Sequence, residues 1–129
     1  MNPLERIILV DDNDLDNVFH EIVIRKTGFK GEVRVFESGT DFLAFLKQDA
    51  LSPRTCVFLD INMPLLSGFD VARSISPVLQ NTPGFELHFL TSSGSTQDKQ
   101  MAGSIPGVSG YLVKPLTREF LVERFQLGT

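Results

Sequence analysis

The stretch Ile7-Ile8-Leu9-Val10-Asp11-Asp12 joins four consecutive apolar residues directly to two acids. A run that is apolar on both faces is typical of a central strand in a parallel sheet, because helices cover both sides of such a strand. The adjacent carboxylates repel each other, and a further acid follows at Asp14. The stretch therefore predicts a buried strand, and it raises the question whether solvent or a bound cation balances the acids at its end.

Composition sets the first limits on function. The sequence has 129 residues, of which 42% are hydrophobic, so it fits one domain, 1–129, with a sizeable core. Its net charge of −4 disfavours nonspecific binding to nucleic acid, which requires a basic surface. The single cysteine, Cys56, fits a reducing compartment. Since no apolar stretch suits a signal peptide or a membrane span, we expect a cytoplasmic protein that contacts neither nucleic acid nor membrane.

Short apolar runs alternate with helical patterns along the rest of the chain. Further strands are predicted at 32–36, 55–60, 86–91 and 111–113, and the first of these, short and alternating, suits a sheet edge. Helices are predicted after Asn13 or Asp14, after Ser38, from about Gly68 until Pro77 closes or kinks it, over Thr96–Ala102, and after Thr117. Five βα units predict an α/β fold, doubly wound, with helices on both faces of one parallel sheet.

The first predicted helix carries a clear apolar pattern. Its apolar residues recur at helical spacing and are Leu15, Val18, Phe19 and Ile22. Such a stripe is typical of the side of a helix that packs on the core. His20 lies beside Phe19 in this pattern, and we expect its side chain to be half-exposed.

Residues that carry chemistry follow the ends of the predicted strands. In an open parallel sheet, sites form beyond the carboxyl ends of the strands. These ends supply Asp11, Asp12, Asp60, Thr91 and Lys114. Three carboxylates beside one ammonium leave a formal excess of two negative charges. A divalent cation that prefers oxygen ligands, such as Mg²⁺, relieves this excess without protonation.

This set of groups favours phosphoryl transfer. Asp60 is the candidate nucleophile, because carboxylates form aspartyl phosphates. Lys114 can hold one phosphoryl oxygen and the Thr91 hydroxyl can donate to another. A single Asp after a strand is often only a turn former or a helix cap, which is our interpretation of Asp14. Four strand ends with suitable groups argue for a site.

The sequence resembles the receiver domain of bacterial two-component response regulators. The matching segments are Val10-Asp11-Asp12, Leu59–Pro64 with Gly68, Leu90-Thr91-Ser92 and Gly110–Pro115. The resemblance implies a flavodoxin-like sheet with strand order 2-1-3-4-5. It also implies a signalling switch that receives a phosphoryl group from a sensor histidine kinase or a phosphotransfer protein and passes the change to an unknown downstream protein.

The resemblance also implies which residues form the phosphorylation site. Asp60 is implied to be the phosphoacceptor. The metal ligands of Mg²⁺ are implied to be the carboxylates of Asp11, Asp12 and Asp60, together with the main-chain carbonyl of Asn62. No other cofactor is implied.

Further residues are implied to read the phosphorylation state. Thr91 and Lys114 are implied to bind the phosphoryl group, and Tyr111 to turn inward when Thr91 moves. The Lys114-Pro115 peptide bond is implied to be cis. The change is implied to travel through the fourth helix, the fifth strand and the fifth helix.

Three other functions fit parts of the sequence. A phosphohydrolase could use Asp60, but haloacid-dehalogenase-type enzymes place a second Asp where this chain has Asn62, and they need a lid. A flavin carrier shares the fold, but Asp11, Asp12 and Asp14 would repel the flavin phosphate. A binding module without phosphorylation leaves the full acid set unexplained. We expect no enzyme beyond self-phosphorylation and autodephosphorylation, in either a stand-alone receiver or part of a longer regulator.

Overall fold

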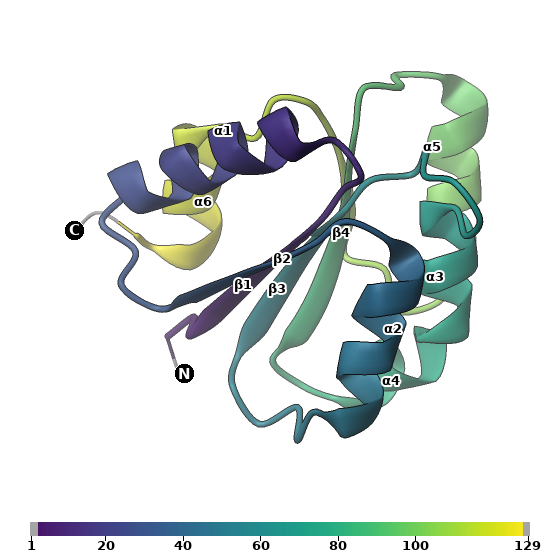
Figure 1. The fold of residues 1–129 in the computed structure, drawn as a ribbon, viewed down its shortest axis with the longest axis horizontal. Helices are drawn as coiled ribbons and strands as arrows, with labels where there is room; N and C mark the ends of the chain where they lie inside the picture. The colour runs from purple at the N-terminus through teal and green to yellow at the C-terminus, as the bar shows by residue number, and fades with distance from the viewer. Residues whose placement is uncertain (1–2, 128–129) are drawn as a thin grey trace.

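One parallel sheet organises the structure, a computed structural model that describes residues 3–127 (Figure 1). Its strands are β1 (Arg6–Val10), β2 (Glu32–Phe36), β3 (Thr55–Leu59), β4 (Phe85–Thr91) and β5 (Gly110–Val113). They lie in the order β2-β1-β3-β4-β5, and every neighbouring pair is parallel. The predicted flavodoxin-like topology is confirmed, with β2 at one edge.

Helices cover both faces of this sheet (Figure 1). They are α1 (Asp14–Lys26), α2 (Gly39–Gln48), α3 (Gly68–Ser74), α4 (Ser76–Asn81), α5 (Thr96–Gly103) and α6 (Arg118–Phe125). α1 and α6 lie on one face, and α2 to α5 lie on the other. Within residues 3–127, every helix is too short or too polar to cross a lipid bilayer.

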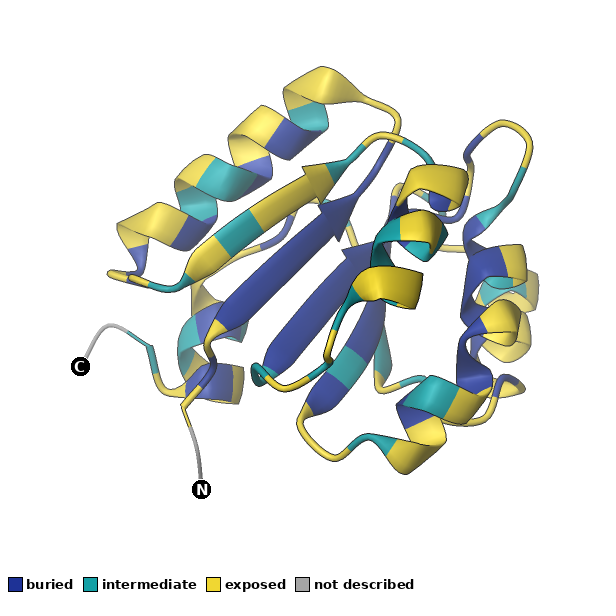
Figure 2. Ribbon diagram, turned by 60° about the horizontal axis from the view of Figure 1, so that its bottom comes forward, coloured by how far each residue is buried: buried dark blue, intermediate teal, exposed yellow. Residues whose placement is uncertain are grey.

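The two central strands β1 and β3 set the position of the site. All their residues are buried, whereas the edge strand β2 is largely exposed (Figure 2). Their register pairs Val10 with Leu59, and the Asp60 amide donates to the Val10 carbonyl at 2.9 Å. The first residues beyond the two strands, Asp11 and Asp60, therefore leave the sheet side by side.

Side-chain caps begin most of the helices. The residues whose side-chain oxygen accepts a hydrogen bond from a backbone amide of the first turn are Asn13, Ser38, Ser67, Ser95 and Thr117. Of the two candidates for α1, Asn13 is the cap, so the interpretation of Asp14 as the cap was wrong. Asp14 is the first helical residue, where its negative charge favours the helix N-terminus.

The predicted orientation of α1 was wrong. The residues of its apolar stripe are exposed, at 79%, 57%, 50% and 49% for Leu15, Val18, Phe19 and Ile22. Its buried residues are Asn17, His20 and Ile24, so the prediction of a half-exposed His20 was also wrong. The cause lies at the helix start, where the Asn17 side chain donates to the Asp11 carbonyl at 2.8 Å and turns this polar side toward the sheet.

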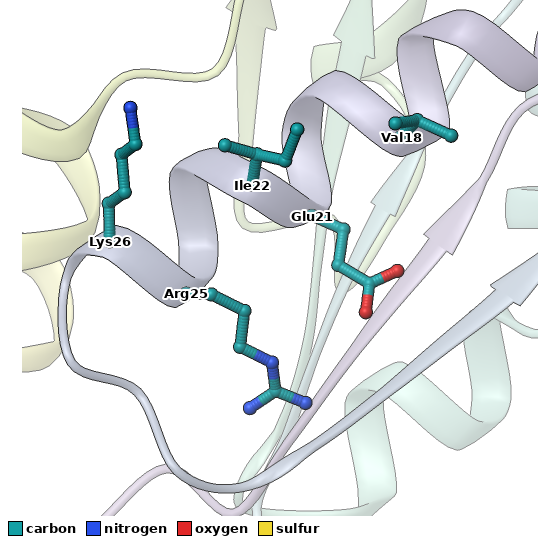
Figure 3. A pocket seen from close by; sticks show the side chains of 5 residues that line it. All are labelled: Val18, Glu21, Ile22, Arg25 and Lys26. Atoms are coloured by element: carbon teal, nitrogen blue, oxygen red, sulfur yellow. The ribbon is translucent and has the colours of Figure 1, made fainter.

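Part of the exposed stripe borders an open pocket on the outer surface of α1 (Figure 3). Val18 and Ile22 line it together with three charged side chains, those of Glu21, Arg25 and Lys26. Within residues 3–127, these apolar side chains are about half exposed or more, so this side of α1 faces solvent.

The crossover between β3 and β4 contains two short helices instead of the one predicted. α3 ends at Ser74, and Ile75 separates it from α4, which has Pro77 in its first turn. Proline suits that place because a first-turn residue needs no backbone donor. The predicted break was correct, but Pro77 lies in the first turn of a second helix that begins at Ser76. The weak helix pattern at Thr96–Ala102 is confirmed as α5, one residue longer.

Gly68 allows the loop after β3 to pack close to the backbone of Asp60 and Ile61. A Cβ atom at Gly68 would lie 2.2 Å from the Asp60 carbonyl oxygen and 2.8 Å from the Ile61 Cα. Because both are backbone atoms, we expect Gly68→Ala to lower the free energy of unfolding by about 1–3 kcal/mol, measured by urea denaturation.

The matched control is Gly103→Ala, at the last residue of α5. A Cβ atom there meets nothing within 4 Å, so the change should be neutral or slightly stabilising. Equal urea midpoints for the two variants would contradict the packing argument.

Candidate functional site

Three carboxylates meet where β1 and β3 end. Each of Asp11, Asp12 and Asp60 offers a carboxylate oxygen, and these oxygens all lie within 4.8 Å of one another. Asp11 and Asp60 are 4% and 6% exposed, whereas Asp12 is an exposed residue. The sequence predicted this grouping, and the structure adds that the site opens to solvent on the side of Asp12.

Lys114 reaches this group from the end of β5. Its Nζ lies 2.6 Å from Asp11 Oδ2 and 3.6 Å from Asp60 Oδ2, and a third carboxylate, Asp16, also lies at 2.6 Å. Burial lowers the pKa of Lys114, but the hydrogen bonds to Asp11 and Asp16, together with the charges of Asp60 and Asp11, raise it overall. Lys114 is therefore a firmly charged ammonium. The predicted cis peptide bond between Lys114 and Pro115 is confirmed.

Asp60 is the acid most affected by its surroundings. Burial raises the pKa of its carboxyl group, as does the nearby charge of Asp11, while Lys114, the Ile61 amide and Thr91 act in the opposite direction. The Ile61 amide donates to Asp60 Oδ1 at 2.9 Å. One ammonium therefore does not fully compensate the acids, which agrees with the predicted need for a further cation.

The loop after β4 links Thr91 to Tyr111. Thr91 is fully buried, and its Oγ1 accepts a hydrogen bond from the Ser93 amide at 3.4 Å. The Tyr111 hydroxyl donates to the Ser93 carbonyl oxygen, while its ring packs partly against Phe89. The Ser93 hydroxyl donates to Asp98 of α5 at 2.7 Å. A displacement of Thr91 would therefore be transmitted through Ser93 to Tyr111 in β5 and to Asp98 in α5.

Asn62 lies in the loop between β3 and α3, with an exposed side chain. The loop is fixed on both sides of it, because the amides of Met63 and Gly68 both donate to the Ile61 carbonyl, at 3.2 and 2.8 Å. The assignment of its main-chain carbonyl as a metal ligand stays a prediction.

Sequence reasoning missed the contribution of α1 to the site. Asp16 contacts Lys114, and His20 lies one turn further along the same helix, where burial lowers its pKa and the charge of Lys114 lowers it further. Asn13, Asp16 or Asn17, and His20 form a polar stripe at helical spacing. This stripe was the available signal, but the stronger apolar stripe of the same helix outweighed it.

The raised pKa of Asp60 predicts how stability depends on pH. The contribution of Asp60 to stability should fall as pH rises from the unfolded-state pKa, about 3.9, through the raised folded-state value, because folding then requires an unfavourable buried charge. In EDTA at pH 7, we expect Asp60→Asn to raise the free energy of unfolding by roughly 0.5–2 kcal/mol in chemical denaturation. The gain should vanish below about pH 3.9, where the acid is protonated in both states. An Asn variant no more stable than wild type at pH 7 would contradict this.

Comparisons with known proteins agree with the fold and the site. A model of the response regulator receiver domain family matches residues 7–126. The DNA-binding response regulator MtrA of Mycolicibacterium paratuberculosis is 32% identical over 120 residues, which are 93% of this chain and 49% of MtrA. The chain thus spans about half the length of the curated relatives it matches.

Solved structures show the same fold. A two-component response regulator from Cytophaga hutchinsonii superposes with a TM-score of 0.84 at 24% identity, covering 97% of this chain and 96% of that one. The Mn²⁺-bound form of response regulator Rcp1 has a TM-score of 0.72 at 25% identity, covering 95% and 89%. Because the family match spans nearly the whole sequence, this chain belongs to the response regulator receiver domain family of two-component signal transduction.

Proposed function

We propose that this receiver domain accepts a phosphoryl group on Asp60 with the help of Mg²⁺. The observation that carries the proposal is the position of the Asp60 carboxylate. It is buried next to the Asp11 and Asp12 carboxylates, and its Oδ2 lies 3.6 Å from the Lys114 ammonium. This arrangement provides a nucleophile, a cation for a phosphoryl oxygen and an incompletely balanced set of acids.

The acids suit a hard divalent cation. The carboxylates of Asp11, Asp12 and Asp60 and the main-chain carbonyl of Asn62 would hold Mg²⁺, which prefers oxygen ligands and keeps several positions for water or phosphate. When bound, the ion neutralises charge on the acids and on the phosphoryl oxygens. The structurally similar response regulator Rcp1 was solved in an Mn²⁺-bound form, which supports the binding of a divalent cation by this fold.

The protein groups have separate tasks in the transfer. The Ile61 amide holds Asp60 Oδ1, which leaves Oδ2 to form the new P–O bond while the bond between phosphorus and the donor atom breaks. Lys114 binds one phosphoryl oxygen as a point charge, and the Thr91 hydroxyl donates to another. We propose no turnover beyond self-phosphorylation from small donors and autodephosphorylation.

The proposed partners are a donor of the phosphoryl group and a downstream protein. Members of this family interact with kinases and downstream effectors. A sensor histidine kinase or a phosphotransfer protein is the proposed donor. The output surface predicted as the fourth helix, fifth strand and fifth helix corresponds to α5, β5 and α6, because the third crossover contains two helices. The fully buried free thiol of Cys56 fits a cytoplasmic location.

Phosphorylation of Asp60 is directly testable. With Mg²⁺ and acetyl phosphate, mass spectrometry should show one added phosphoryl group on the wild-type chain. When EDTA is present from the start to remove Mg²⁺, no phosphoryl group should be added. Asp60→Asn, which lacks the nucleophile, should stay unmodified. An equal adduct on Asp60→Asn, or none on wild type, would refute the proposed acceptor.

Tyr111 offers an internal probe of the switch, because the chain has one tyrosine and no tryptophan. We expect beryllofluoride, an analogue of the phosphoryl group, to change the tyrosine fluorescence in the presence of Mg²⁺. The reason is that a donation from Thr91 to the analogue would displace the loop whose Ser93 carbonyl accepts from Tyr111. Asp60→Asn should show no change. An unaltered spectrum while ¹⁹F NMR shows bound beryllofluoride would contradict a role for this ring.

A further inference from the structure

Asp16, an acid outside the trio at the strand ends, holds Lys114 in this structure. Its Oδ2 lies 2.6 Å from Lys114 Nζ, as close as Asp11 Oδ2 and closer than Asp60 Oδ2 at 3.6 Å. An ammonium has three protons to donate, and these two short hydrogen bonds occupy two of them. The lysine proposed to bind the phosphoryl group is therefore bound mainly to other acids.

The two acids that hold Lys114 differ in how easily they can release it. The Asp11 side chain is 6% exposed, and its Oδ1 also accepts from the Asn13 amide at 2.9 Å. The Asp16 side chain is 37% exposed and lies at the solvent edge, in the first turn of α1. Asp16 can exchange Lys114 for water at little cost, whereas Asp11 would be left buried with an uncompensated charge.

Asp16 also adds to the charge imbalance of the site. Four carboxylates, those of Asp11, Asp12, Asp16 and Asp60, then face one ammonium, which leaves a formal excess of three negative charges. A phosphoryl group brings further negative charge to Asp60. It would draw the ammonium toward Asp60 and away from the Asp16 carboxylate, and that carboxylate would repel the phosphoryl group.

We propose that Asp16 is a positioning residue that holds Lys114 in the unphosphorylated state and opposes its transfer to the phosphoryl group. This inference rests on the proposed function of Asp60. Asp16 lowers the stability of the phosphorylated state relative to the resting state, because part of the lysine's interaction must be withdrawn from the Asp16 carboxylate.

The same helical turn offers a matched control. Asp14 lies two residues before Asp16 and carries the same charge, but its side chain hydrogen-bonds Glu37 instead of Lys114, which raises the pKa of Glu37. Asn13 caps α1 through the backbone amide of Asp16, so replacement of the Asp16 side chain leaves the cap in place. Asp14→Asn and Asp16→Asn thus remove the same charge from the same turn, and only the second removes a carboxylate that contacts Lys114.

The test is a beryllofluoride titration at saturating Mg²⁺, followed by ¹⁹F NMR. Asp16→Asn should raise the affinity about fivefold over wild type, the effect of replacing one competing charge-assisted hydrogen bond by a weaker neutral one. Asp14→Asn should change it by less than about twofold, the weaker effect of a screened surface charge. Asp16→Glu, which restores a carboxylate, should return the affinity toward the wild-type value.

A double-mutant cycle shows whether the effect passes through Lys114. In a Lys114→Ala background, Asp16→Asn should give no more gain than Asp14→Asn. A gain that persists without the lysine, or equal affinities for Asp14→Asn and Asp16→Asn in the presence of the lysine, would overturn the proposal. Failure of wild type to bind beryllofluoride would instead refute the proposed function, and this inference with it.

Discussion

The sharing of one ammonium by several carboxylates is the constraint on which the site depends. Parallel pairing of β1 with β3 delivers Asp11 and Asp60 to one place, and the Lys114 amide is fixed by the Thr91 carbonyl at 2.8 Å. Backbone hydrogen bonds thus hold like charges together that would separate in solution. The cost appears in the raised pKa of Asp60, which burial and Asp11 produce together. The ionised Asp60 carboxylate therefore lowers stability, because it is buried beside another acid.

Two sets of contacts connect this charge balance to the surface. Lys114 contacts Asp16, so the balance involves the first turn of α1. Thr91, Ser93 and Tyr111 connect the same site to β5, and Ser93 connects it to α5. The hydrogen bond from Asn17 to the Asp11 carbonyl and the contact of Asp16 with Lys114 both lie at the start of α1 and hold its polar side toward the site, which leaves the apolar stripe in solvent. Because the polar side of α1 faces the charged site, its most apolar side cannot also pack on the sheet.

How much the sequence predicted depends on the range of the interactions involved. Strands β1 and β3 were predictable because full burial requires continuous apolar runs, and the acid trio followed because parallel strands end at one edge. The orientation of α1 was not predictable, since periodicity identifies an apolar stripe without indicating whether another element covers it. Asp16 and Lys114 are 98 residues apart, so their contact has no local signal. The division into α3 and α4 required knowing that Pro77 lies in a first turn rather than at an end.

We propose that a divalent cation supplies the charge missing among these acids, and a Mg²⁺ titration of thermal unfolding would reveal it. A ligand that binds only the folded state stabilises it by about 2.7 kcal/mol at one hundred times its dissociation constant. The melting temperature of the wild-type chain should therefore rise steadily with Mg²⁺. Asp12→Asn, which removes the exposed ligand, should need much more Mg²⁺ for the same rise. A melting temperature that does not respond to Mg²⁺, or that responds equally in both proteins, would contradict the account.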